Sequence, residues 1–150
     1  FRQSCIYGRR QFGIEDQGWV AHFVIATILN RPITIYGDGK QVRDLLHVQD
    51  LVRAYDLGIT QIDTLRGEVF NVGGGPQNTL SIWTEFGPLL AELAGHDVMV
   101  NRAAWRPGDQ RVFIADVRKI ADKLGWQPTI SPEQGIRDLY AWVLANPELF

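Results

Sequence analysis

The chain lacks the residues and patterns that mark several common classes of protein. It has one cysteine among 150 residues, so an internal disulfide is impossible, and a reducing compartment such as the cytoplasm is expected. A formal net charge of only -2 gives no general attraction to nucleic acid. The apolar stretch 20–29 is interrupted by His22 and Thr27 and is too short to cross a bilayer. We therefore expect neither a nucleic-acid partner nor a membrane partner.

Two cofactor and catalytic patterns are also missing. Gly73 and Gly75 follow an apolar segment, but Asn78 stands where a dinucleotide loop needs its third glycine, so a tight strand-to-helix turn is expected. Tyr36 and Lys40 have the spacing Tyr-x-x-x-Lys, yet two glycines lie between them and prevent the helix that this pair requires. Neither feature predicts a catalytic site.

Metal and thiol chemistry have little support. The three histidines have no ligand spacing, and no metal site is expected. Cys5 ends an apolar segment, which favours a buried thiol over a nucleophile.

The order of predicted elements indicates an α/β protein. The length fits one domain with a real core. Strands and helices alternate in the first half, and the second half is more helical. Strands are predicted at 1–6, 33–36, 42–46, 68–72, 98–100 and 111–115, with 33–36 and 42–46 forming a hairpin-like pair. Helices are predicted at 18–29, 51–58, 81–94, 116–124 and 132–145, capped respectively by Asp16 or Gln17, Asp50, Ser81, Asp116 and Ser131.

The segment YGDGKQVRDLLHVQDLVRAY, residues 36–55, carries the clearest chemistry. Arg43 stands beside a glycine-rich turn, where the backbone can approach a phosphate and the guanidinium can donate two parallel hydrogen bonds. Arg9, Arg10, Arg106 and Arg111 also fall where strands meet loops. Each arginine alone fits a solvated surface residue equally well, but together they favour a dianionic ligand such as a diphosphate. Trp19, Tyr36 and Trp105 lie near these loops and suit contact with a base or sugar, while Trp19 and Trp105 suit the core equally well.

Four segments resemble one family of enzymes. They are SCIYGRRQFGIEDQGWVAHF, PITIYGDGKQVRDLLHVQDLVRAY, FNVGGG and RPGDQRVFIADVRKI, and they occur in order along essentially the whole chain. The chain resembles the C-terminal half of the extended short-chain dehydrogenase/reductases that act on nucleotide sugars. The QFGIEDQGWV loop is most similar to the CDP-paratose 2-epimerase branch of that family. The implied fold is the C-terminal part of a Rossmann-like α/β structure, comprising the last strands of the parallel sheet and a smaller mixed substrate-binding lobe.

This resemblance also implies roles for particular residues. Arg43 and Arg106 match the arginines that hold the nucleotide diphosphate and ribose. Gln17 matches an amide offered to the pyrophosphate at a helix N-terminus. Thr34 and Tyr36 match the strand that lies along the base, and Asp109 matches an acid that braces the ribose-side loop. Ser4 and Tyr7 fall in the segment that passes the nicotinamide and the sugar. Arg9 stands where many relatives have proline and is the candidate for subtype selection.

The resemblance further implies a reaction with NAD as cofactor and a CDP-sugar or other nucleotide-sugar as substrate. Hydride leaves sugar C2, a transient 2-keto sugar forms, the sugar presents its other face, and hydride returns, which converts CDP-paratose to CDP-tyvelose. We expect residues 1–150 to supply nucleotide-sugar binding as a piece of a longer polypeptide, because the chain begins at Phe1 in a strand and lacks the N-terminal dinucleotide-binding portion. Alone it is expected to be inactive and to expose apolar edges. The complete enzyme is expected to be a homo-oligomer.

Three alternatives stay open from the sequence. The complete enzyme could be a nucleotide-sugar 4-epimerase or a 4,6-dehydratase of the same superfamily. The chain could also be a free-standing nucleotide-binding module without catalysis, or a degenerate fragment that binds nothing.

Overall fold

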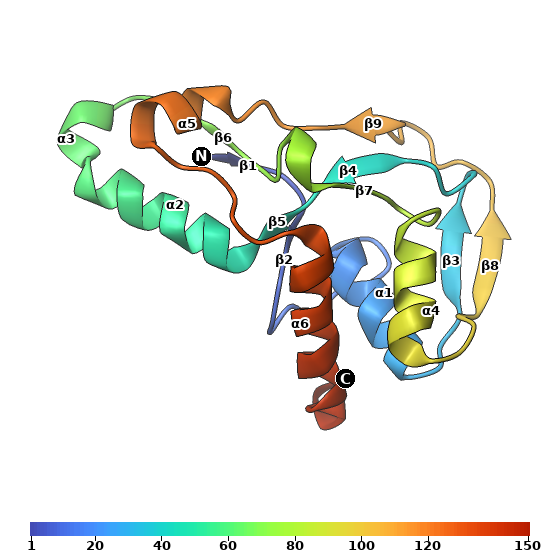
Figure 1. Cartoon of the computed structure of the whole chain (residues 1–150). Coiled ribbons are helices and arrows are strands. Elements are labelled where there is room, and N and C mark those ends of the chain that lie inside the picture. The colour runs from blue at the N-terminus through green and yellow to red at the C-terminus, as the bar shows by residue number, and fades with distance from the viewer.

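Short strands in four small sheets and six α-helices make up the chain (Figure 1). The computed structural model describes residues 1–150. The strands are β1 (Arg2–Gln3), β2 (Ile6–Tyr7), β3 (Ile33–Tyr36), β4 (Val42–Asp44), β5 (Leu46–His47), β6 (Asn71–Val72), β7 (Thr79–Ser81), β8 (Val100–Ala103) and β9 (Val112–Phe113). The helices are α1 (Trp19–Ile28), α2 (Val48–Thr60), α3 (Ile62–Leu65), α4 (Phe86–Ala94), α5 (Arg118–Leu124) and α6 (Pro132–Leu144), with 3-10 turns at Pro76–Asn78 and Pro147–Leu149.

Most strand pairs are parallel, which confirms the predicted α/β class. β1 pairs with β6, β2 with β5, and β3 with β8, all in parallel, while β4 lies between antiparallel β7 and parallel β9. Parallel neighbours need long connections, so each pair joins segments that are distant in sequence. The β1–β6 pair corresponds to the two segments expected as the last strands of a parallel sheet.

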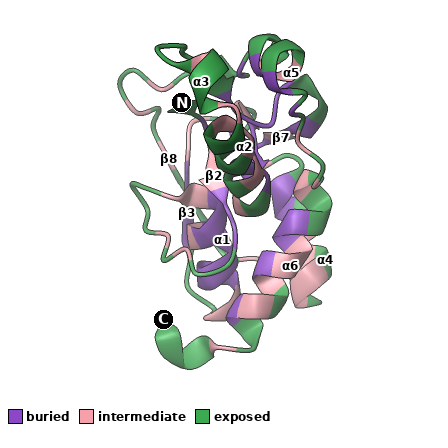
Figure 2. Ribbon diagram, turned by 90° about the vertical axis from the view of Figure 1, so that its left-hand side faces the viewer, coloured by how far each residue is buried: buried purple, intermediate pink, exposed green.

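Two hydrophobic cores stabilise two layers of the structure. The larger core packs α1 against α4, α6 and β3, and seven residues of α1 are buried. Figure 2 shows this helix as largely purple in the centre of the molecule. The smaller core places the β1–β6 pair between α2 and α5, around Phe70, Val72, Ile120 and Trp126 (Figure 1). Ile33 and Ile35 of β3 belong to the larger core, so this strand is held by well-packed neighbours.

Two strand predictions were wrong for reasons of tertiary structure. Residues 33–36 and 42–46 do not form a hairpin, because β3 pairs with β8 and β4 pairs with β7 and β9. Gly37 and Gly39, both at positive φ, turn the chain between them. The single strand predicted at 1–6 is divided at Cys5, whose φ is 31°, so that β1 and β2 join different sheets.

The residue predicted to cap the N-terminus is correct for α6 and wrong for α1 and α2. Ser131 caps α6 by accepting a hydrogen bond from the Gln134 amide, as predicted. Neither Asp16 nor Gln17 caps α1, since Gly18 occupies the N-cap position in the left-handed conformation. His47, and not Asp50, caps α2, and its ring nitrogen Nδ1 accepts from the Gln49 amide. No helix in the structure combines the length and apolar character that a membrane span requires.

Candidate functional site

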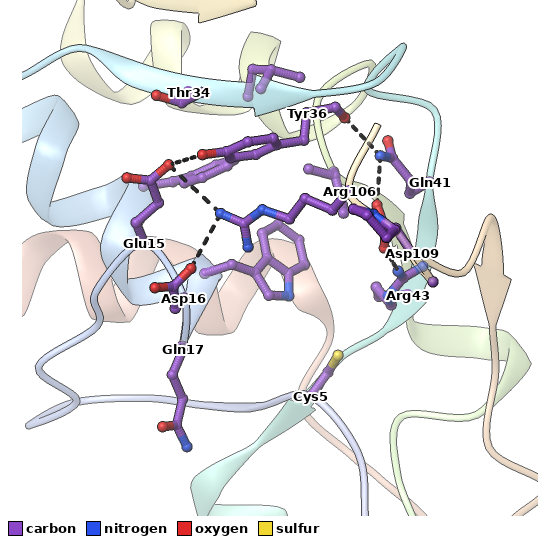
Figure 3. A pocket seen from close by; sticks show the side chains of 17 residues that line it. Cys5, Glu15, Asp16, Gln17, Thr34, Tyr36, Gln41, Arg43, Arg106 and Asp109 are labelled. Atoms are coloured by element: carbon purple, nitrogen blue, oxygen red, sulfur yellow. Dashed lines mark hydrogen bonds and ion pairs between the residues drawn. The ribbon is translucent and has the colours of Figure 1, made fainter. Parts of the chain in front are cut away.

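A cleft of about 340 Å³ opens where four segments meet (Figure 3). These segments are the loop before α1, strand β3, strand β4 and the loop between β8 and β9. All six residues that the sequence singled out for substrate binding line this cleft, namely Gln17, Thr34, Tyr36, Arg43, Arg106 and Asp109. The two arginines are 63 positions apart in the numbering, yet the fold brings both to one cavity.

Arg43 is held firmly in the wall of the cleft. Its Nη2 donates to Asp109 Oδ1 at 2.9 Å, and its Nη1 donates to the carbonyl of Val42 at 2.9 Å. The Arg43 side chain is only 13% exposed. Two of its five N–H donors are therefore used, and three are left for a ligand. A guanidinium fixed in this way is preorganised to donate to phosphate oxygens.

Arg106 crosses the cleft from the opposite loop. Its guanidinium carbon lies 3.8 Å from the centre of the Tyr36 ring, which is cation–π geometry. Its Nη2 is 3.6 Å from Glu15 Oε1 and 3.4 Å from Asp16 Oδ1. The Tyr36 hydroxyl donates to the same Glu15 oxygen at 2.6 Å. Because these ion pairs are long and exposed to solvent, each is weak, and an incoming anion can replace them.

The cleft holds more carboxylates than guanidinium groups. Glu15, Asp16 and Asp109 face Arg43 and Arg106. A diphosphate is therefore attracted by individual N–H donors and not by an excess of positive charge. Figure 3 shows Gln17 lying apart from the Arg106 cluster, at the side of the cleft formed by the loop before α1.

Ser4, Tyr7 and Arg9, which the resemblance places near cofactor and sugar, do not line this cleft. Ser4 is buried and donates to buried Asp44 at 3.0 Å. Tyr7 is 1% exposed and packs edge-on against His47, and burial raises the pKa of its hydroxyl. Arg9 is exposed on the loop after β2.

Sequence reasoning missed several residues of the cleft. Glu15, Asp16 and Gln41 carry its polar contacts, and only their place within the familiar segments pointed to them. Cys5 also lines the cleft and is half-buried, so the expected burial of this thiol is only partial. Burial raises the pKa of this thiol. Trp19 lines the cleft while its ring packs on Phe86, whereas Trp105 lies over Gly37, outside the cleft.

The glycine loop after β6 is a packing feature. A side chain at Gly73 or Gly74 would collide with Asp44 or with the backbone of Leu45, and the Gly75 amide donates to Asp44 at 3.0 Å. Gly73 and Gly74 pack inward, and the loop leads from β6 directly into the 3-10 turn Pro76–Asn78, in agreement with the predicted tight turn. Tyr36 and Lys40 are likewise separated by the Gly37–Gly39 turn and share no helix.

Comparison with known proteins identifies the family. Residues 14–139 match the family described as GDP-mannose 4,6 dehydratase. The chain belongs to this family, within the superfamily of NAD-dependent epimerases and dehydratases. A CDP-paratose 2-epimerase of Salmonella typhi is 40% identical over 147 residues, which are 95% of this chain and 43% of that protein. A dTDP-glucose 4,6-dehydratase of Haemophilus influenzae is 37% identical over 79% of this chain and 37% of its own length.

Solved structures of enzymes from the superfamily have the same fold. The UDP-glucose 4-epimerase of Thermotoga maritima with UDP-glucose has a TM-score of 0.80 and 32% identity, over 99% of this chain and 46% of its own. The UDP-glucuronic acid 4-epimerase of Bacillus cereus, in complex with UDP-glucuronic acid and NAD, has a TM-score of 0.84 and 27% identity, over 99% of this chain and 45% of its own. The chain thus spans less than half the length of these relatives. The expected Rossmann-type α/β fold is confirmed.

Proposed function

We propose that this chain is the nucleotide-sugar-binding C-terminal portion of an NAD-dependent epimerase that converts CDP-paratose to CDP-tyvelose. The observation that carries the proposal is the single cleft in which Arg43 and Arg106 meet beside Tyr36. Two guanidinium groups with unused N–H donors suit a diphosphate, and Tyr36 with Thr34 gives the nucleoside a surface to lie on. The similarity to the Salmonella CDP-paratose 2-epimerase supports the choice of sugar and base.

The protein's share of the work is to hold the nucleotide while the sugar turns. An anchor at the diphosphate leaves the sugar free to present either face, and the binding energy of the remote nucleotide then serves orientation at the reacting carbon. NAD supplies the hydride chemistry when bound. The residues of this chain do not form a dinucleotide loop, so we assign the cofactor mainly to an N-terminal portion that this chain does not contain. Residues 1–150 alone are accordingly expected not to catalyse the reaction.

Calorimetric titration with CDP tests the binding role. Wild type is expected to bind CDP, and Arg43→Ala is expected to lose about 1.5–3 kcal/mol of binding free energy, the usual worth of a hydrogen bond to a charged group. Arg66→Ala is the matched control, because Arg66 is an exposed arginine that pairs only with exposed Asp63. Equal affinity of wild type and Arg43→Ala would refute the arginine assignment.

A 4,6-dehydratase or a 4-epimerase is the second candidate, favoured by the similarity to the Haemophilus and Thermotoga enzymes. Incubation of CDP-paratose and NAD with the protein joined to a dinucleotide-binding portion separates the candidates. Inversion at C2, seen by NMR of the product sugar, is expected. Product with unchanged C2 would remove the 2-epimerase assignment.

A further inference from the structure

Gln41 is a buried amide at the point where three segments of the cleft meet. The residue is 2% exposed. Its Nε2 donates to the carbonyl of Tyr36 at 2.8 Å and to Asp109 Oδ2 at 3.0 Å. Both partners can only accept, so the orientation of the amide is fixed. Its Oε1 is buried and has no partner in the structure. The side chain thus donates two hydrogen bonds, while its one acceptor atom has no partner.

Asp109 connects this amide to both arginines. Its second oxygen, Oδ1, accepts from Arg43 Nη2 at 2.9 Å, and its own backbone amide donates to the carbonyl of Arg106 at 3.2 Å. The Asp109 side chain is 21% exposed, so these contacts are only partly screened by water. Hydrogen bonds therefore connect the end of β3, through Gln41 and Asp109, to the Arg43 guanidinium on β4 and to the loop that carries Arg106 (Figure 3).

We propose that Gln41 is a positioning residue, which fixes Asp109 so that Arg43 presents its free N–H donors to the diphosphate. This inference rests on the proposed nucleotide-binding function. A neutral amide is suited to this place because it donates to two acceptors at once. A glutamate would set a second carboxylate within hydrogen-bonding distance of Asp109 and push that carboxylate away. An aliphatic side chain would leave the Tyr36 carbonyl and Asp109 Oδ2 without a donor.

A double-mutant cycle with Arg43 tests the proposal. If Gln41 acts through Arg43, Gln41→Glu weakens CDP binding about tenfold in the wild-type background and less than twofold in the Arg43→Ala background. A residue that only supports the fold would weaken binding by the same factor in both backgrounds. Gln77→Glu is the matched control, because Gln77 is exposed, lies outside the cleft and makes no hydrogen bond through its side chain. It introduces the same charge and is expected to leave the affinity unchanged.

A second variant and the affinity of wild type separate failure of the positioning role from failure of the proposed function. Asp109→Asn removes the carboxylate charge to which Gln41 donates. It is expected to weaken CDP binding in the wild-type background and by less than twofold in the Arg43→Ala background. It replaces Gln41→Glu in the cycle if circular dichroism shows that Gln41→Glu does not fold. Wild-type binding of CDP together with equal losses in both backgrounds would overturn the positioning role and leave the proposed function standing. Wild type that binds no CDP at millimolar concentration would overturn both.

Discussion

Protonation of His47 is expected to destabilise the fold, since this ring caps a helix as an acceptor. His47 is 3% exposed, and its Nδ1 accepts from the Gln49 amide at 3.4 Å at the start of α2. The proton of the neutral ring therefore sits on Nε2. A second proton on Nδ1 would abolish the cap and place a cation at the positive end of the helix dipole.

The size of the effect follows from burial and charge. Burial lowers the pKa of His47, with a smaller contribution from Arg9, while Asp50 and Asp138 act in the opposite direction. A folded-state pKa below the ordinary value of 6.5 means that the unfolded chain takes up the proton first. The stability due to neutral His47 is therefore complete above about pH 6.5 and falls as the pH decreases toward the folded-state pKa. The slope from this one group is at most about 1.4 kcal/mol for each pH unit.

Urea denaturation between pH 5 and 8 measures this dependence in wild type, His47→Asn and His47→Ala. Asparagine is a good N-cap that does not titrate, so His47→Asn is expected to reduce the slope below pH 6.5. Loss of the cap and of the edge-on contact with Tyr7 is expected to make His47→Ala about 2–3 kcal/mol less stable at pH 8. His22 also has a pKa lowered mainly by burial, and His22→Asn measures its separate share of the slope. An unchanged slope in His47→Asn would refute the reasoning.

Three further predictions address other parts of the molecule. Asp50→Asn is expected to lose about 1–3 kcal/mol of unfolding free energy in urea at pH 7. The buried carboxylate accepts through both oxygens, Oδ2 from the amides of Thr129 and Ile130 at 2.9 Å and Oδ1 from the Thr129 hydroxyl at 2.8 Å, whereas an asparagine amide can accept through only one atom. Cys5 is the only thiol and lines the cleft, so saturating CDP is expected to slow its alkylation several-fold at pH 8.5; an unchanged rate would argue against CDP in this cleft. A Cβ at position 135 would collide with the Tyr7 hydroxyl, so Gly135→Ala is expected to lower the thermal midpoint clearly more than substitution of Arg66 on the surface does.

Local sequence signals were sufficient for most helices and for the chemistry of the turns. The helices predicted at 18–29 and 132–145 agree with α1 and α6 to within one residue at each end, and Ser131 was correctly predicted as the cap of α6. These features depend on neighbours in the chain, so a short window of sequence contains the necessary information.

Strand partners depended on tertiary structure. β3 pairs with β8, which begins more than sixty residues later, and a parallel pair has no connecting turn that could reveal it. The kink at Cys5 likewise lies where the chain passes from one sheet to another, since β1 pairs with β6 and β2 pairs with β5. The pattern of apolar residues indicates that a strand exists and gives no information about the strand beside it.

The sequence by itself determined the kind of residues that the site uses, and familiar segments named Arg43, Arg106 and Tyr36. Only the folded chain decided that these side chains share one cleft, that Asp109 and Gln41 fix one arginine, and that Glu15 and Asp16 hold the other over an aromatic ring. The physical reason is that the character of a side chain is local, whereas its orientation, burial and ion-pair partners come from segments joined across the sheet.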